Sequence, residues 1–158
     1  MGIAREGPWA PMVGDPDDHR PETTWRLSAD PGNANGAFAA LAVLEERCAV
    51  GDRIPLHRHD VDEVVIIQGG QAEYQLGEER HLAEAGDRVF IPAGTVHGAR
   101  NLGDVALHLH AVFPATRVRM EMLERNPAPG TEDRPPMTTG YDFRTGEVTV
   151  EGPTRRNQ

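Results

Sequence analysis

The amino-acid sequence predicts an all-β fold, in which short antiparallel strands form a single barrel with a tail at each end. Two observations support this prediction. The 158 residues include 17 Gly and 13 Pro, which interrupt the chain too often for a helical bundle and suit short strands joined by turns. From residue 53 onward, apolar side chains alternate or form short runs, as they do in strands that are buried on one or both faces. With 38% hydrophobic residues, the chain can bury one core of modest size, and its length fits one domain.

The first fifty residues give the weaker part of the pattern. Residues 1–22 are rich in Pro, Gly and Asp and have no apolar period, so we expect an irregular arm. The body of the domain begins near Trp25. Residues 36–51 have an Ala, Leu and Glu content that suits a helix, but the strand pattern that follows favours a long strand.

The remaining strands are clearer. They are expected in VVIIQGG, QAEYQL, DRVFIP, VALHLHAVF and, by alternation, in residues 117–122. Together these segments predict a six- to eight-stranded barrel domain over residues 23–123. Residues 124–158 then form a tail: 126–136 read as a Pro-rich linker, and 141–150 as a last strand or a hairpin around Thr145 and Gly146.

Composition and charge exclude several classes of protein. The formal net charge is −9 and Lys and Arg form no run, which argues against nucleic acid or an anionic membrane as a partner. No apolar stretch approaches the ~18 residues of a membrane span, and the first residues lack the apolar core of a signal peptide. The single Cys48 cannot form an internal disulfide. These features lead us to expect a cytoplasmic protein.

Four residues predict a metal site. His57 and His59 are two positions apart, so on a strand their imidazoles share one face and can reach one ion. Glu63 has the same parity and follows an acidic corner that can turn its carboxylate back toward that ion. His97 lies on the next hairpin, from which an antiparallel neighbour can bring it across. Three imidazoles and one carboxylate suit a divalent Fe, Mn, Co, Ni, Cu or Zn ion.

The spacing of these ligands with Gly and Pro resembles a known family. GDRIPLHRHDVDEVVIIQGG resembles the first conserved motif of the cupin superfamily, and GDRVFIPAGTVHGARN resembles the second. The fixed positions are Gly51, His57, His59, Glu63 and Gly70 in the first motif, and Gly86, Pro92, Gly94, His97 and Asn101 in the second. The resemblance covers about residues 36–114, and the short spacing between the motifs is similar to that of the small single-domain cupins. It implies a jelly-roll barrel that holds the metal inside through these four ligands, and it implies a homodimer, formed, as is frequent in this family, by exchanging or pairing N-terminal strands.

His108 and His110 raise the alternative of a second site, because they also share one face of a strand. The apolar residues Leu107, Leu109 and Ala111 occupy the other face, and the apolar face of a barrel strand normally points inward. We therefore expect both histidines to face solvent or a partner subunit. By the same parity, the substrate pocket is expected to be lined by Val65, Ile67, Leu109 and Ala111.

The sequence leaves three functions open. It contains no Ser-His-Asp arrangement, phosphate cradle or second acidic pair, so the metal is expected to be the chemical centre, with Glu63 as a ligand throughout or as a general base. Four protein ligands leave two positions on a six-coordinate ion, which favours Fe(II), with Mn, Ni, Co or Zn as alternatives. The first hypothesis is an oxygenase acting on a small chelating enol or phenolic compound. The second is a non-redox cyclase, isomerase or lyase similar to tetracenomycin-type polyketide cyclases, and the third is a small-molecule binding protein without catalysis.

Overall fold

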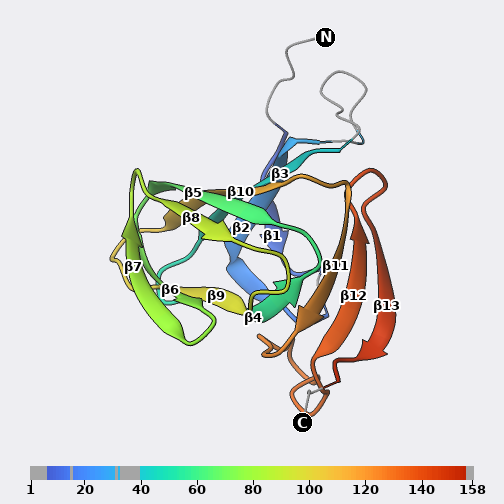
Figure 1. The fold of residues 1–158 in the computed structure, drawn as a ribbon. Coiled ribbons are helices and arrows are strands. Elements are labelled where there is room, and N and C mark those ends of the chain that lie inside the picture. The colour runs from blue at the N-terminus through green and yellow to red at the C-terminus, as the bar shows by residue number, and fades with distance from the viewer. Residues whose placement is uncertain (1–6, 15, 31, 33–39, 156–158) are drawn as a thin grey trace.

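The computed structural model describes residues 7–14, 16–30, 32 and 40–155, and all regular structure within them is β-strand (Figure 1). The strands are β1 (Ala10–Met12), β2 (Arg20–Ala29), β3 (Ala42–Cys48), β4 (Arg53–His59), β5 (Glu63–Gly69), β6 (Gln71–Leu76), β7 (Glu79–Glu84), β8 (Arg88–Ile91), β9 (His97–Asn101), β10 (Leu107–Phe113), β11 (Arg117–Met122), β12 (Met137–Asp142) and β13 (Glu147–Pro153). Within these ranges no helix is long and apolar enough to cross a membrane.

The strands form two antiparallel sheets that face each other (Figure 1). One sheet has the order β1-β2-β3-β10-β5-β8, and the other has the order β13-β12-β11-β4-β9-β6-β7. Consecutive strands therefore often lie in different sheets, as in a jelly roll, and β10 lies between β3 and β5. The predicted all-β jelly-roll class is confirmed.

The core lies between the sheets and follows the alternation of each strand. In β10, Leu107, Leu109, Ala111 and Phe113 are buried, whereas the histidines between them are partly exposed. Inward side chains of the other strands complete the core: Ala42, Cys48, Val65, Ile67, Ala72, Tyr74, Ala83, Val89, Ile91, Ala99 and Val118. The expected orientation of β10 is thus observed.

Gly70 shows why the first motif closes on glycine. It has a φ of 82°, which side chains with a Cβ rarely adopt. A Cβ at this position would also lie 2.9 Å from the carbonyl oxygen of Ala106 and 2.9 Å from the Cα of Leu107. Gly70 therefore lets β5 turn into β6 while β10 passes directly beside it.

The prediction of an irregular arm over residues 1–22 is wrong for the part that the structure describes. β1 and the start of β2 lie in this range and extend the first sheet through β3. Asp17 and Asp18 between them are buried, and Asp17 Oδ1 accepts a hydrogen bond of 2.5 Å from Arg125 Nε. Two backbone hydrogen bonds, from His19 N to Asn126 O and from Asn126 N to Asp17 O, are both 2.8 Å long and also join these segments. We call these contacts between residues 17–19 and residues 125–126 the clamp. Hydrogen bonds between polar side chains hold this segment in place, so its sequence lacks the apolar period by which a strand is normally recognised. Residues 1–6 lie outside the described ranges.

Three other segments refine the sequence prediction. Residues 36–39 lie outside the described part, and the strand expected there is observed as β3 from Ala42. Residues 79–84, for which the sequence predicts no strand, form β7, whose side chains are almost all exposed and so give no apolar period. The predicted C-terminal hairpin is observed as β12 and β13 around Thr145 and Gly146, and β12 pairs with β11.

Candidate metal centre

Three imidazoles meet inside the barrel, where the two sheets face each other. His57 and His59 lie at the end of β4, and His97 opens β9 directly opposite His57 in the antiparallel register. The ring centroids are 4.2 Å apart for His57 and His97, 4.7 Å for His59 and His97, and 5.8 Å for His57 and His59. All three side chains are buried. The register therefore brings the HxH pair and the distant histidine to one point.

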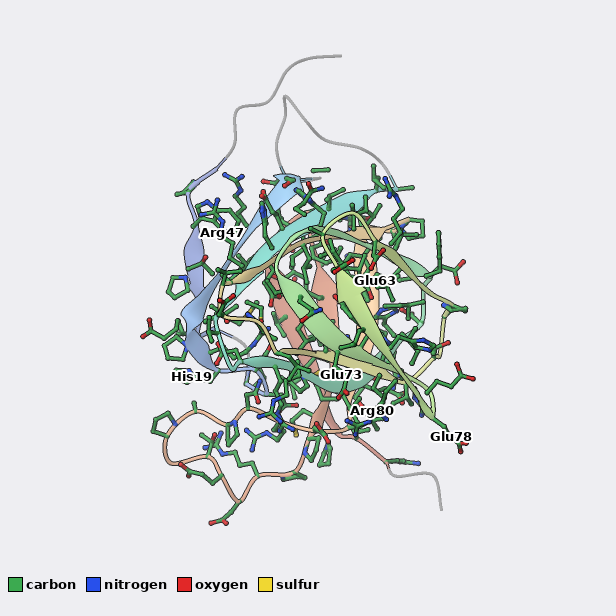
Figure 2. All side chains as sticks on the ribbon, turned by 90° about the vertical axis from the view of Figure 1, so that its left-hand side faces the viewer. His19, Arg47, Glu63, Glu73, Glu78 and Arg80 are labelled. Carbon is green, nitrogen blue, oxygen red and sulfur yellow. The ribbon has the colours of Figure 1, made fainter. Side chains whose placement is uncertain are left out.

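Glu63 reaches the same point from the other sheet. It is the first residue of β5, and its Oε2 lies 2.9 Å from His59 Nε2 and 3.2 Å from His97 Nε2. Figure 2 labels Glu63 among the side chains drawn over the central strands. The structure thus brings all four expected ligands together, in the arrangement that the acidic corner before Glu63 suggested.

Backbone carbonyls fix the orientation of each imidazole. The Nδ1 of His57 donates to Pro55 O at 2.8 Å, that of His59 to Val61 O at 2.7 Å, and that of His97 to Thr95 O at 2.8 Å. A carbonyl oxygen only accepts, so each Nδ1 carries a proton, and Nε2 is the atom through which each ring, when neutral, can offer a lone pair to an ion. Metal-binding histidines commonly have this arrangement, because the bond at Nδ1 aims Nε2 at the ion.

The protonation states also suit a cation. Burial would raise the pKa of Glu63, but the interactions with His59 and His97 outweigh it and lower the pKa to about 2. Burial and the neighbouring His97 lower the pKa of His57 to about 3. Burial would also lower the pKa of His59, but the hydrogen bond with Glu63 raises it. At neutral pH the cluster therefore contains an ionised carboxylate and at least one imidazole that is firmly neutral.

One buried nitrogen of the cluster lacks a hydrogen-bond partner among the described residues. His97 Nε2 is buried, and its contact with Glu63 lacks hydrogen-bond geometry, so it has no hydrogen bond among the described residues. Leaving a buried nitrogen without a partner is costly, and a metal ion would supply the missing partner. Three imidazoles and one carboxylate fit a divalent metal ion, although this donor set does not choose among the first-row metals.

A cavity of about 300 Å³ opens beside the centre, and His57, Glu63 and His97 form part of its wall. Most of its other lining is apolar. The lining includes Met12, Trp25, Leu44, Ile54, Val65, Ile91, Leu109, Ala111, Phe113, Met122 and Phe143. Of the four residues predicted for the pocket, Val65, Leu109 and Ala111 line it. Ile67 does not, because it is packed in the core with 1% of its surface exposed.

Sequence analysis missed a charged part of this wall. Arg20, Asp18 and Glu46 line the cavity and are buried. Arg20 donates to both carboxylate oxygens of Asp18, at 2.7 and 2.6 Å, and to Glu46 Oε1 at 2.6 Å. Burial raises the pKa of Glu46, and Arg20 offsets this only in part. The parity of β3 was the available signal, because Ala42, Leu44, Glu46 and Cys48 share its inward face.

Tyr74 adds a further polar group to the cavity wall. It lines the cavity with 2% of its surface exposed, and its hydroxyl has no hydrogen-bond partner among the described residues. Burial, together with Glu63 and Glu46, raises its pKa well above the ordinary value. The hydroxyl is therefore a neutral donor that is free to bind a ligand.

Comparisons with known proteins agree with this picture. Residues 44–113 match the family model described as Cupin domain, which confirms the resemblance for this part of the chain. Over 51 residues, the chain is 45% identical to quercetin 2,3-dioxygenase from Bacillus subtilis (strain 168), a match that covers 32% of this chain and 15% of that protein.

Two solved structures illustrate the likeness of fold. KdgF from Halomonas sp. superposes with a TM-score of 0.55 at 20% identity, over 68% of this chain and 86% of that one. Salicylate 1,2-dioxygenase from Pseudaminobacter salicylatoxidans superposes with a TM-score of 0.54 at 15% identity, over 64% of this chain and 28% of that one. The chain therefore spans only a small part of the two dioxygenases, and at these identities the two structures inform the fold alone.

Proposed function

We propose that this chain, whose residues 44–113 form a cupin domain, is a metal-dependent oxygenase that acts on a small chelating enol or phenolic compound. The observation that carries the proposal is the position of the four-ligand centre. It lies in the wall of a mostly apolar cavity of about 300 Å³, so a small organic molecule in the cavity would lie against the metal. The short similarity to a quercetin 2,3-dioxygenase supports the same reaction class.

Iron(II) is the metal we favour. Four protein ligands leave two positions on a six-coordinate ion, enough for two oxygen atoms of a chelating substrate or for one such atom and dioxygen. When bound, the ion would supply Lewis acidity and a redox partner for oxygen.

The chain's own residues would hold and orient the substrate. Val65, Leu109 and Ala111 would contact its apolar body and exclude water. Glu63 would remain a ligand or take a proton from a substrate hydroxyl group at its Oε2 atom, which faces His59 and His97. Tyr74 would donate a hydrogen bond to a polar group of the substrate that points away from the metal.

A non-redox cyclase, isomerase or lyase is the second candidate, and the charged wall favours it. Glu46 is buried with a raised pKa, and Arg20 is the only hydrogen-bond partner of its carboxylate among the described residues. A buried carboxyl group whose pKa is raised can act as a general acid or base toward a substrate in the cavity. Chemistry of this class needs Lewis acidity from the metal but no oxygen.

Metal analysis of protein purified without an affinity tag would come first, followed by reconstitution of the metal-free protein with Fe(II) or Zn(II). Oxygen consumption would then be measured with a flavonol, a catechol and a β-diketone as probes. We expect consumption only with the Fe(II) protein, and we expect His57→Ala to abolish it. His81→Ala removes an exposed histidine from β7 and is the matched control, which should retain full activity.

The outcomes separate the candidates. If Fe(II) protein consumes no oxygen with any chelating probe, the oxygenase is wrong. Conversion of a probe by Zn(II) protein under strict anaerobiosis would instead establish the non-redox enzyme. Tight binding of a probe without any conversion would identify a binding protein.

A further inference from the structure

A second cluster of metal-ligating side chains lies on the outer face of the first sheet. Glu45 on β3 and His110 on β10 are direct neighbours in the antiparallel register, and His108 lies two positions along β10 on the same face. This face points away from the cavity, because the alternate residues of both strands form the core. None of the three residues takes part in the central metal site.

The donor atoms are spaced as metal ligands are. Glu45 Oε1 lies 2.6 Å from His108 Nε2 and 3.6 Å from His110 Nε2. The corresponding distances from Glu63 at the central site are 2.9 and 3.2 Å. A tetrahedral ion with bonds of about 2.0–2.1 Å separates its ligand atoms by roughly 3.3 Å, which lies between the two distances at the outer cluster. All three donor atoms lie within 4.8 Å of one another.

The second carboxylate oxygen of Glu45 is held by hydrogen bonds from two side chains of β2. Its Oε2 accepts hydrogen bonds from Arg26 Nε at 2.6 Å and from Ser28 Oγ at 2.9 Å, which turns Oε1 toward the two imidazoles. Partners of this kind orient the ligands of natural metal sites. Burial would raise the pKa of Glu45, but the hydrogen bonds from Arg26, His108 and Ser28 lower it to about 2, so the carboxylate is ionised.

The cluster is also accessible from solvent. The Glu45 side chain is 5% exposed, whereas His108 and His110 are 31% and 24% exposed. An ion could therefore approach past the imidazoles and keep at least one position for water. The carboxylate beneath them would still be shielded from bulk solvent, which strengthens its attraction for a cation.

We propose that Glu45, His108 and His110 bind one divalent transition-metal ion on the outer face of the barrel. Two imidazoles and a carboxylate suit ions of intermediate softness, such as Zn(II), Cu(II), Ni(II) or Co(II). The guanidinium groups of Arg26 and Arg47 lie 4.3 and 4.2 Å from the ring centroid of Trp9, on the same face. Their positive charge should make this site at least tenfold weaker than the central one, which has one more ligand and no arginine among its hydrogen-bond partners.

Zinc titration of the full chain tests the proposal. The metal-free protein, prepared without an affinity tag, is titrated with Zn(II) in a calorimeter at neutral pH. We expect two binding steps of one equivalent each, and we expect His108→Ala/His110→Ala to lose the weaker step and keep the stronger one. His81→Ala is the matched control, because His81 also pairs with a glutamate, Glu79 at 3.1 Å, but no third ligand joins them among the residues that the structure describes. It should keep both steps.

Two further variants guard against a misfolded double variant. Glu45→Gln keeps the shape of the side chain and should remove the weaker step. Ser28→Ala touches no ion and should weaken that step alone, by roughly tenfold, as loss of an orienting partner commonly does. A single equivalent of zinc in the unaltered protein, or a second step that survives in Glu45→Gln, would overturn the proposal. Neither result depends on whether the central site is an oxygenase.

Discussion

The hydroxyl of Tyr74 is buried in the cavity wall without a hydrogen-bond partner among the described residues. Because its removal breaks no bond to protein, we expect Tyr74→Phe to change the free energy of unfolding by less than about 1 kcal/mol. Binding of a hydroxylated probe to the metal-loaded protein should weaken by about fivefold, the equivalent of one hydrogen bond. Denaturant unfolding and calorimetric titration measure the two effects. A large loss of stability would show that the hydroxyl is needed by the fold itself.

Cys48 offers a test of burial at the level of one thiol. Burial, with a further contribution from Glu46, raises its pKa to about 12. The thiol should therefore stay protonated at pH 8, and we expect it to resist a disulfide reagent such as DTNB in the native protein. One thiol per chain should react after unfolding in guanidinium chloride. Val50→Cys in a Cys48→Ala background places a thiol at an exposed position and should react at once.

The four central ligands could be predicted because their signal is local. Two histidines at i and i+2 share a strand face whatever the rest of the fold does, and the spacing to Glu63 and His97 matches a known motif. Glu45 and Glu46 carry no such signal. Whether each points inward or outward depends on the exact register of β3, and the sequence left that segment open between helix and strand. Their partners, Arg20 and Arg26, lie in or near the segment that was expected to be irregular.

The close contact between β4 and β9 depends on Gly98, which has no Cβ. A Cβ on Gly98 would lie 2.8 Å from the carbonyl oxygen of Ile54 and 3.1 Å from Leu56 Cδ2, so the two strands would have to move apart. Because His97 precedes this position, Gly98→Ala should shift one metal ligand against the others. We expect about 1–3 kcal/mol of destabilisation and at least tenfold weaker zinc binding.

Gly140→Ala is the control for that prediction. Gly140 also lies in a strand, β12, but the nearest atom to its Cβ would be Thr149 Cβ at 4.0 Å, an ordinary contact. This variant should bind zinc like the unaltered protein. Equal zinc affinity in the two variants would mean that β9 can move without disturbing the centre.

At the level of whole elements, the strands with an alternating or continuous apolar pattern could be predicted, whereas β1 and β7 could not. β6, β10 and β11 carry a period of two in their apolar side chains, and β5 and β8 are short apolar runs. β1 has only three residues, and the side chains of β7 are almost all exposed, so neither strand shows an apolar period in its sequence. Sequence periodicity reports burial, and an edge strand held by backbone pairing escapes it.

For the molecule as a whole, a bound metal ion should contribute to stability, because the four central ligands already lie together and His97 Nε2 has no hydrogen-bond partner among the described residues. Metal at 100 times its dissociation constant adds about 2.7 kcal/mol to the free energy of unfolding. For a chain of this size, that corresponds to a rise in Tm of roughly 5–10 °C. The rise should shrink as pH falls into the acid range, because the raised pKa of His59 lets a proton compete with the ion for that imidazole. His57, with a pKa of about 3, gives up the ion only at much lower pH.

Calorimetry of the metal-free and metal-loaded protein, with a chelator in the reference, measures this rise. His57→Ala should remove most of it. An identical Tm with and without metal would contradict a preformed centre.

The homodimer implied by the family resemblance stays a prediction. Phe90 on β8 is 69% exposed, and its register partner Val64 on β5 is only partly exposed, so the outer face of this sheet has an apolar edge. If two copies pair there, light scattering should give twice the chain mass, and Phe90→Glu should reduce it to that of a monomer. A monomeric unaltered protein would remove this expectation.

The clamp of Asp17 and Asp18 against Arg125 and Asn126 has a consequence for folding kinetics. It joins segments 108 residues apart in the chain, and the cavity draws its lining from Met12 at one end to Val148 at the other. Contacts of such long sequence separation carry a high loop-closure entropy, and all-β domains rich in them fold in milliseconds to seconds. A ribosome would have to release nearly all of these residues before the barrel could close, so the ability to bind a ligand should arrive late and all at once.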